Sequence, residues 1–190
     1  MAYILFISEE KLKSGSAING NVDEAFLLPY VRVAQKNYVE TKLGTDLNDK
    51  LKDLIENGTI NNAGNAVYKK LLDDYIADML VHWAFYECFP WLQYKVENKN
   101  IFSKTSETGN ALSDSEASLL REEIRNTAEY YTERLVDYIC NNNSDYPEYS
   151  TNTGADVRPD KDVYFAGMNL ENTRSQGNRL TLRDFLDSSI

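Results

Sequence analysis

The longest run of helical periodicity lies in residues 65–97. Large apolar side chains recur there every three or four residues, which places them on one broad face of a helix. They are Val67, Tyr68, Leu71, Leu72, Tyr75, Ile76, Met79, Leu80, Trp83 and Tyr86. The pattern predicts a helix that is buried along much of its length. Pro90 interrupts the pattern between Phe89 and Trp91, and a proline inside a helix predicts a kink.

A second long helix is predicted after a polar stretch. Residues 98–112 are rich in Ser, Thr and Gly and predict a loop. Ser113 and Glu116 then have the spacing of a capping box, in which each side chain bonds the other residue's backbone N–H. Apolar positions at helical intervals follow, and the run Asn141-Asn142-Asn143 predicts the end of this helix.

Residues 23–43 predict a helix with an awkward proline near its start. Pro29 has no N–H and crowds the preceding turn, so it fits only a first turn or a kink. We therefore expect the helix to begin near Leu28. Gly44 follows as the predicted stop.

A shorter helix is predicted next, from an N-cap at Thr45 or Asp46 to Asn57-Gly58. Before both helices, residues 3–20 combine a short apolar run with one possible helical turn, which Ser14-Gly15-Ser16 would end. We interpret residues 3–20 as an ordered or partly ordered arm.

The last third of the chain is polar and rich in turn residues. Residues 141–162 carry a local negative charge and predict a linker or a long surface loop. Residues 163–190 regain apolar side chains but are too few to form a core of their own. This segment either packs back on its own bundle or docks onto a neighbour. We expect a mainly α fold, a bundle of about four helices over residues 1–142, followed by a linker and a mostly irregular C-terminal arm over residues 143–190.

Composition narrows the functional classes. The chain has 190 residues and 42% apolar residues, enough for one domain with a real core. Its formal net charge of −10 repels phosphate and argues against nucleic-acid binding by the whole surface. Neither a secretory signal nor a membrane-spanning stretch is apparent. Cys88 and Cys140 lie far apart, so we expect buried free thiols in a protein kept in a reducing cytoplasm.

Residues suited to catalysis are scarce. The one histidine, His82, shares a predicted helix face with Asp74 and Asp78, which leaves open a metal-binding alternative. One histidine supplies no second imidazole, so the favoured interpretation is a histidine satisfied by the Asp78 carboxylate. Nucleophile and phosphate-binding motifs are lacking, and the adjacent carboxylates Asp73-Asp74 and Glu122-Glu123 point apart on a helix. We expect neither enzyme activity, nor a catalytic residue, nor a cofactor, nor a bound metal.

Thirteen tyrosines suggest interfaces, because a tyrosine joins an apolar ring to a polar tip. Helical spacing assigns about half of them to core packing. We expect the others, with Tyr146, Tyr149 and Tyr164 of the polar third, to contact another chain.

The order of several short motifs resembles a known family. They are Asn19-Gly20-Asn21-Val22-Asp23, Leu28-Pro29-Tyr30, Ala34-Gln35, Tyr38, Leu43-Gly44-Thr45, Leu47 and Leu51, followed by an aromatic helix through Trp83 and Tyr86. Residues 3–142 thereby resemble the head–tail connector (adaptor) proteins of tailed bacteriophages, of the kind found in Bacteroides-infecting and crAss-like phages. That resemblance implies a small helical subunit of a dodecameric ring that attaches to the portal protein, extends the DNA channel and docks further neck or tail proteins. It also implies a place at the virion neck after assembly in the host bacterial cytoplasm.

The resemblance gives the C-terminal arm a docking role. Its expected contact residues are Tyr164, Phe165, Arg174, Arg179, Leu180, Arg183, Phe185 and Leu186. A neutral or acidic channel would let genomic DNA slide past without sequence-specific binding, which agrees with the net charge of −10. Two alternatives remain open: a cytosolic helical scaffold that binds a partner protein, and a metal-binding helical bundle.

Overall fold

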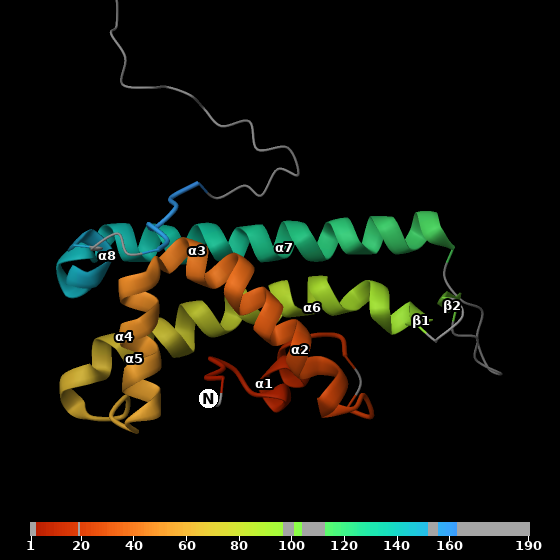
Figure 1. Cartoon of the computed structure of the whole chain (residues 1–190). Coiled ribbons are helices and arrows are strands. Elements are labelled where there is room, and N and C mark those ends of the chain that lie inside the picture. The colour runs from red at the N-terminus through yellow and green to blue at the C-terminus, as the bar shows by residue number, and fades with distance from the viewer. Residues whose placement is uncertain (1–2, 19, 97–100, 104–112, 152–155, 163–190) are drawn as a thin grey trace, which may run out of the picture.

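A computed structural model describes residues 3–18, 20–96, 101–103, 113–151 and 156–162, and these form a mainly α-helical bundle, as the sequence predicts (Figure 1). The predicted irregular arm, residues 163–190, lies outside the described residues. The helices and strands are α1 (Glu9–Gly15), α2 (Glu24–Ala34), η1 (Gln35–Val39), α3 (Glu40–Leu43), α4 (Thr45–Glu56), η2 (Ala63–Asn65), α5 (Ala66–Leu71), η3 (Leu72–Ile76), α6 (Ala77–Gln93), β1 (Tyr94–Val96), β2 (Ile101–Ser103), α7 (Asp114–Asn141), η4 (Asn143–Asp145) and α8 (Pro147–Thr151).

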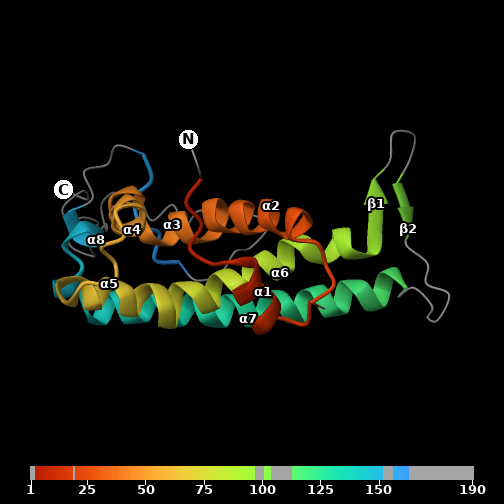
Figure 2. The same cartoon turned by 90° about the horizontal axis from the view of Figure 1, so that it is seen from below.

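Helix α6 is the central element. Helix α7 runs back along one side of α6, and α2 with α3 covers the other side (Figures 1 and 2). Trp83 of α6, 1% exposed, joins these layers. Its ring stacks on Tyr38 of η1 with 3.8 Å between ring centroids, and its Nε1 donates to Thr132 Oγ1 of α7 at 2.9 Å. One aromatic side chain therefore links three helices by packing and by a satisfied buried donor.

The rod formed by α2 and α3 and the rod formed by α5 and α6 each contain a π-helical turn that the periodicity did not predict. The turn η1 separates α2 from α3, and η3 separates α5 from α6. The turn η1 packs against α6, and η3 packs against α7. A π-turn accommodates one extra residue, so the apolar stripe on each side of it still meets the same neighbour.

The start of α2 differs from the expected one. Asp23 is its N-cap and accepts a hydrogen bond from Ala25 N at 3.0 Å, so the helix begins at Glu24 and the predicted start near Leu28 is wrong. Pro29 lies inside the helix on an exposed face. Its missing N–H leaves the carbonyl of Ala25 without the usual helical donor. The cost is small because both residues are exposed and water can bond that carbonyl.

Other helix ends agree with the sequence more closely. Gly44 stops α3 as predicted, but it is also the N-cap of α4, in place of Thr45 or Asp46. The capping box is confirmed: Glu116 N donates to Ser113 Oγ at 3.4 Å, and Ser113 N donates to Glu116 Oε2 at 3.0 Å. The short antiparallel pair β1–β2, between α6 and α7, was not predicted.

The N-terminal arm and the first part of the linker expected from the sequence both contribute side chains to the core. Phe6, Ile7 and Leu12 of the N-terminal segment are buried in the core. Tyr146 and Tyr149 are also buried there, at 0% and 5% exposure, so the expectation that they contact another chain is wrong. Cys88 is buried as predicted, whereas Cys140 is exposed, contrary to expectation.

Gly44 offers a test of this packing. Its φ is +75°, and a Cβ built there would lie 2.6 Å from Pro159 Cδ. We expect Gly44→Ala to lower the free energy of unfolding by more than about 2 kcal/mol, because backbone strain and a steric clash add together. The matched control is Gly58→Ala, at φ +65° with nothing within 4 Å, for which only the strain of about 1 kcal/mol applies. Urea unfolding measures both, and equal losses would contradict the close packing against Pro159.

Candidate functional site

The N-terminal segment is held by one buried side-chain amide. Gln35 of η1 is 1% exposed. Its Oε1 accepts a hydrogen bond from Phe6 N at 2.9 Å, and its Nε2 donates to the carbonyl of Ile4 at 3.0 Å. The amide thus satisfies backbone groups of an extended segment that would otherwise need a strand partner.

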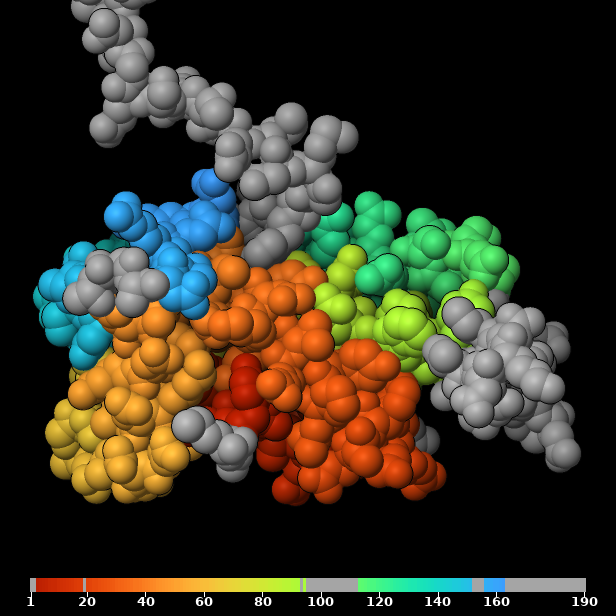
Figure 3. All heavy atoms as spheres, viewed as in Figure 1, coloured from red at the N-terminus to blue at the C-terminus, as the bar shows by residue number. Residues whose placement is uncertain are grey.

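Residues 156–162, the C-terminal strap, are held a short distance along the same helical rod. Thr45 N donates to the carbonyl of Val157 at 3.0 Å, and Val157 N donates to Thr45 Oγ1 at 2.9 Å. Asp160 N donates to the carbonyl of Thr41 at 2.9 Å. The strap therefore occupies free backbone groups at the end of α3 and the start of α4, where a helix lacks internal partners. Figure 3 shows the strap, in blue, lying on the orange atoms of α3 and α4.

A buried charge reinforces the strap. The side chain of Lys42 is 1% exposed, and its Nζ lies 2.6 Å from Asp160 Oδ2. The same Nζ donates to the carbonyl of Asp162. Nearby, the buried carboxylate of Glu40 pairs with Lys36 and lies 3.9 Å from Lys52 Nζ. Residues 35–45, which we name the anchor segment, therefore hold the N-terminal segment and the C-terminal strap within one stretch of chain.

The metal-binding alternative gains no support from the described residues. His82 stacks on Tyr131 with 4.7 Å between ring centroids, and its expected hydrogen bond to the Asp78 carboxylate stays a prediction. Burial lowers the pKa of His82, and the charge of Asp78 opposes that shift only partly. Within the described ranges, no group of three or more His, Cys, Asp and Glu side chains could hold a metal ion.

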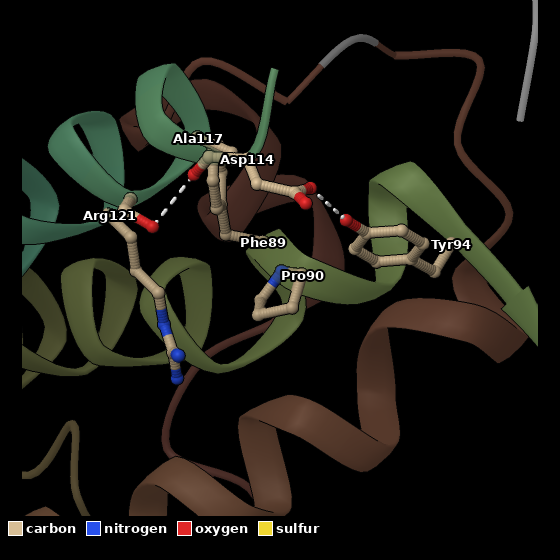
Figure 4. A pocket seen from close by; sticks show the side chains of 7 residues that line it. Phe89, Pro90, Tyr94, Asp114, Ala117 and Arg121 are labelled. Atoms are coloured by element: carbon tan, nitrogen blue, oxygen red, sulfur yellow. Dashed lines mark hydrogen bonds between the residues drawn. The ribbon is translucent and has the colours of Figure 1, made fainter. Parts of the chain in front are cut away.

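Three of the surface cavities among the described residues are lined in part by apolar side chains. The smallest, of about 220 Å³, lies where α6 meets α7 (Figure 4). Phe89 and Pro90 face Ala117 across it, and Tyr94 Oη donates to Asp114 Oδ1 at 2.7 Å at its edge. A second cavity, of about 450 Å³, lies between α6, α7 and the end of α1, and His82, Phe85 and Leu120 line it.

The third cavity lies on the outer face of α2 and is the largest of the three, at about 600 Å³. We name it the α2 groove, and its lining residues are Tyr3, Leu5, Ala25, Leu28, Pro29, Arg32 and Val33. Neither a nucleophile nor an acid–base pair is among them, so the groove suits the binding of apolar side chains rather than chemistry.

Large apolar side chains are also exposed on α6 and α7. Leu119 and Tyr130 of α7 are 64% and 61% exposed, and Leu120 of α7 and Trp91 of α6 are 41% and 39% exposed. Single exposed apolar residues are common on protein surfaces, but several on one pair of helices indicate an interaction surface. Periodicity revealed Leu119 and Leu120 as apolar positions but not that they face outward.

The docking residues predicted from the sequence lie outside the described residues: Tyr164, Phe165, Arg174, Arg179, Leu180, Arg183, Phe185 and Leu186. Their roles stay predictions. What the structure adds is the place where that segment begins, because the strap ends at Asp162 beside Lys42. Sequence reasoning missed this anchor, since a lysine followed by leucine and glycine gives no sign of burial.

The fold and these surfaces define a helical bundle with anchored terminal segments and exposed apolar faces. The chain belongs to Family of unknown function (DUF6712), which matches residues 34–159 and so includes the whole anchor segment and residues 156–159 of the strap. No curated protein and no solved structure matches the chain. Among the described residues, no helix is both long enough and apolar enough to cross a membrane.

The two partners of the strap's ion pair differ in burial, so we expect their removal to change stability by different amounts. Asp160→Asn leaves the buried ammonium of Lys42 without its countercharge, and we expect a loss of about 3 kcal/mol in the free energy of unfolding. Lys42→Met removes the buried charge itself and leaves a half-exposed carboxylate to water, so its cost should stay below about 1 kcal/mol. Chemical denaturation compares the two variants. A larger loss for Lys42→Met than for Asp160→Asn would contradict this expectation. It would mean that the Lys42 ammonium itself stabilises the strap, even without the Asp160 countercharge.

The lowered pKa of His82 should make the stability of the fold depend on pH. Its pKa in the folded chain lies below the ordinary 6.5, so between the two values the unfolded state binds more protons. The free energy of unfolding should therefore fall as the pH drops below 6.5 and level off beneath the folded pKa. In His82→Gln this component should vanish, which urea midpoints at a series of pH values would reveal. Asp78→Asn is the matched comparison, because it removes the opposing charge and should widen the pH interval.

Proposed function

We propose that this protein is a structural virion protein, a subunit of the head–tail connector ring of a tailed bacteriophage. Copies of the chain form a ring, dodecameric by the resemblance, which attaches to the portal protein, extends the DNA channel and docks further neck or tail proteins. It works without catalysis, at the virion neck, and genomic DNA passes without sequence-specific binding.

The observation that carries this proposal is the anchor segment. Several motifs on which the resemblance rests lie there, and in this structure they hold the chain's terminal segments. Gln35 bonds the N-terminal segment, and Gly44 and Thr45 receive the C-terminal strap. A subunit that grips its neighbours through terminal arms needs those arms to leave from fixed points, because a fixed origin reduces the entropy lost on docking. The motif order and the anchoring thus support one role.

Tyr38, another residue of that motif order, supports the same role from inside the bundle. It stacks on Trp83 and donates from its hydroxyl to Glu87 Oε1 at 2.6 Å. Burial, followed by this hydrogen bond, raises the pKa of the tyrosine well above its ordinary value of 10.0. Tyr38 therefore remains neutral and fixes η1 against α6, which makes the anchor segment a rigid base.

Surface chemistry gives further support. The exposed apolar residues of α6 and α7 suit contacts between copies of the chain, since interfaces favour aromatic and large aliphatic side chains. The formal net charge of −10 suits a ring around DNA, because fixed cations would retain the phosphates. The proposed arm contacts, from Tyr164 to Leu186, would supplement this surface.

Assembly of the full chain tests the proposal. We expect the purified protein, alone or mixed with a portal protein, to form rings visible by negative-stain microscopy and by sedimentation. Leu119→Glu with Tyr130→Glu should weaken ring formation at least about tenfold, since each charge would be buried at an apolar contact. Val67→Glu is the matched control, because Val67 is also exposed, at 37%, but lies on α5.

Two results would contradict the proposal. One is a chain that stays monomeric at high concentration and does not bind portal rings. The other is an image of intact particles whose neck lacks this chain. A soluble complex with a non-virion protein would instead favour the scaffold alternative.

A further inference from the structure

The α2 groove is an apolar surface with a preformed shape. Tyr3 and Val33 on its two sides are 37% and 41% exposed. The Arg32 guanidinium lies over the Tyr3 ring, 4.4 Å from its centroid, and Gln35 holds the neighbouring backbone at Ile4. The groove is therefore held open by contacts that do not depend on any occupant.

Pro29 adds a polar feature to this surface. Because it has no N–H, the carbonyl of Ala25 lacks its usual partner at the i+4 position of the helix. Both residues line the groove. An occupant with apolar side chains and a backbone N–H would thus find both kinds of contact there, as extended segments do when they bind grooves.

The C-terminal strap and this groove lie on the same helical rod. Asp162 is held by Lys42, on the same helical rod as the groove. At about 1.5 Å of rise per helical residue, Val33 lies roughly 14 Å and Pro29 roughly 20 Å along the rod from Lys42. Lys36 lies between the two sites. Its pKa is raised chiefly by the hydrogen bond to Glu40, and Asp156 of the strap and Tyr3 of the groove both add to the shift.

The chain that follows the strap has a composition that fits the groove. Residues 163–170 read Val-Tyr-Phe-Ala-Gly-Met-Asn-Leu and contain no charged side chain, although 26% of the whole chain is charged. Fully extended, they reach about 27 Å, which is enough to pass from Asp162 to Pro29. The next residue, Glu171, is charged.

We propose that residues 163–170 dock in the α2 groove of their own subunit, with Tyr164 and Phe165 approaching Val33 and with Met168 and Leu170, further along the segment, covering Leu28 and Pro29. A tether this short gives the segment an effective concentration in the millimolar range, so its own subunit outcompetes a second copy at ordinary protein concentrations. The docking moves Tyr164 and Phe165 from the arm contacts between subunits to their own bundle, and leaves Arg174 to Leu186 for a neighbour. It goes beyond the connector function and does not rest on it.

Cross-linking of paired cysteines in the full chain tests the docking. Val33→Cys with Phe165→Cys, in a Cys140→Ser background, is treated with a short bifunctional maleimide. The matched control is Val67→Cys with Phe165→Cys, because Val67 has a similar exposure of 37% but lies on α5. We expect the Val33 pair to form an intramolecular cross-link at least about tenfold faster than the control, at a rate independent of protein concentration. Intact mass and gel mobility separate monomeric from dimeric products.

Equal rates for the two pairs would overturn the docking. Cross-linked dimers whose yield rises with protein concentration would also overturn it and would assign the groove to the arm of a second copy. A second measurement guards against misfolded cysteine variants. In full-length Tyr164→Ser/Phe165→Ser, amide hydrogen exchange should rise in peptides covering residues 3–5 and 25–33 and stay unchanged in α5. Unchanged exchange in the groove peptides would refute the docking.

Discussion

The structure depends on one constraint, the need to satisfy backbone groups at the ends of α3 and α4 within the anchor segment. The chain breaks its helix at Gly44 and so leaves free carbonyl and N–H groups in a partly buried place. The strap fills that break with Pro159 against the glycine and hydrogen bonds to Thr41 and Thr45. The fixed position of the C-terminal strap follows from this choice of residues.

Much of the helical framework could be predicted because periodicity is a local property. The stripe from Val67 to Tyr86 specified the rod that contains α5 and α6, and Ser113 with Glu116 specified the start of α7. Periodicity does not register a single extra residue, so η1 and η3 were missed. The start of α2 was predicted too late because Pro29 was expected to lie in the first turn. An exposed position inside a helix tolerates a proline better than a buried one.

The candidate site was less predictable because its contacts join distant parts of the chain. Lys42 and Asp160 lie 118 residues apart, and no local pattern indicates that a lysine is buried. Tyr146 and Tyr149 stand among polar and acidic neighbours, a composition typical of a surface loop, yet both rings complete the core. Tyr146 is in edge contact with Tyr68 at 5.8 Å between centroids and donates its hydroxyl to the carbonyl of Val67 at 3.2 Å. Only tertiary packing reveals such burial.

The position of Gln35 and Lys42 on one rod has a mechanical consequence. They lie seven residues apart, about 10 Å at the helical rise. A pull on the chain before Ile4 or after Asp162 would enter the rod at these two side chains and pass between them along η1 and α3. Tension between the two termini would therefore load this short stretch of helix directly.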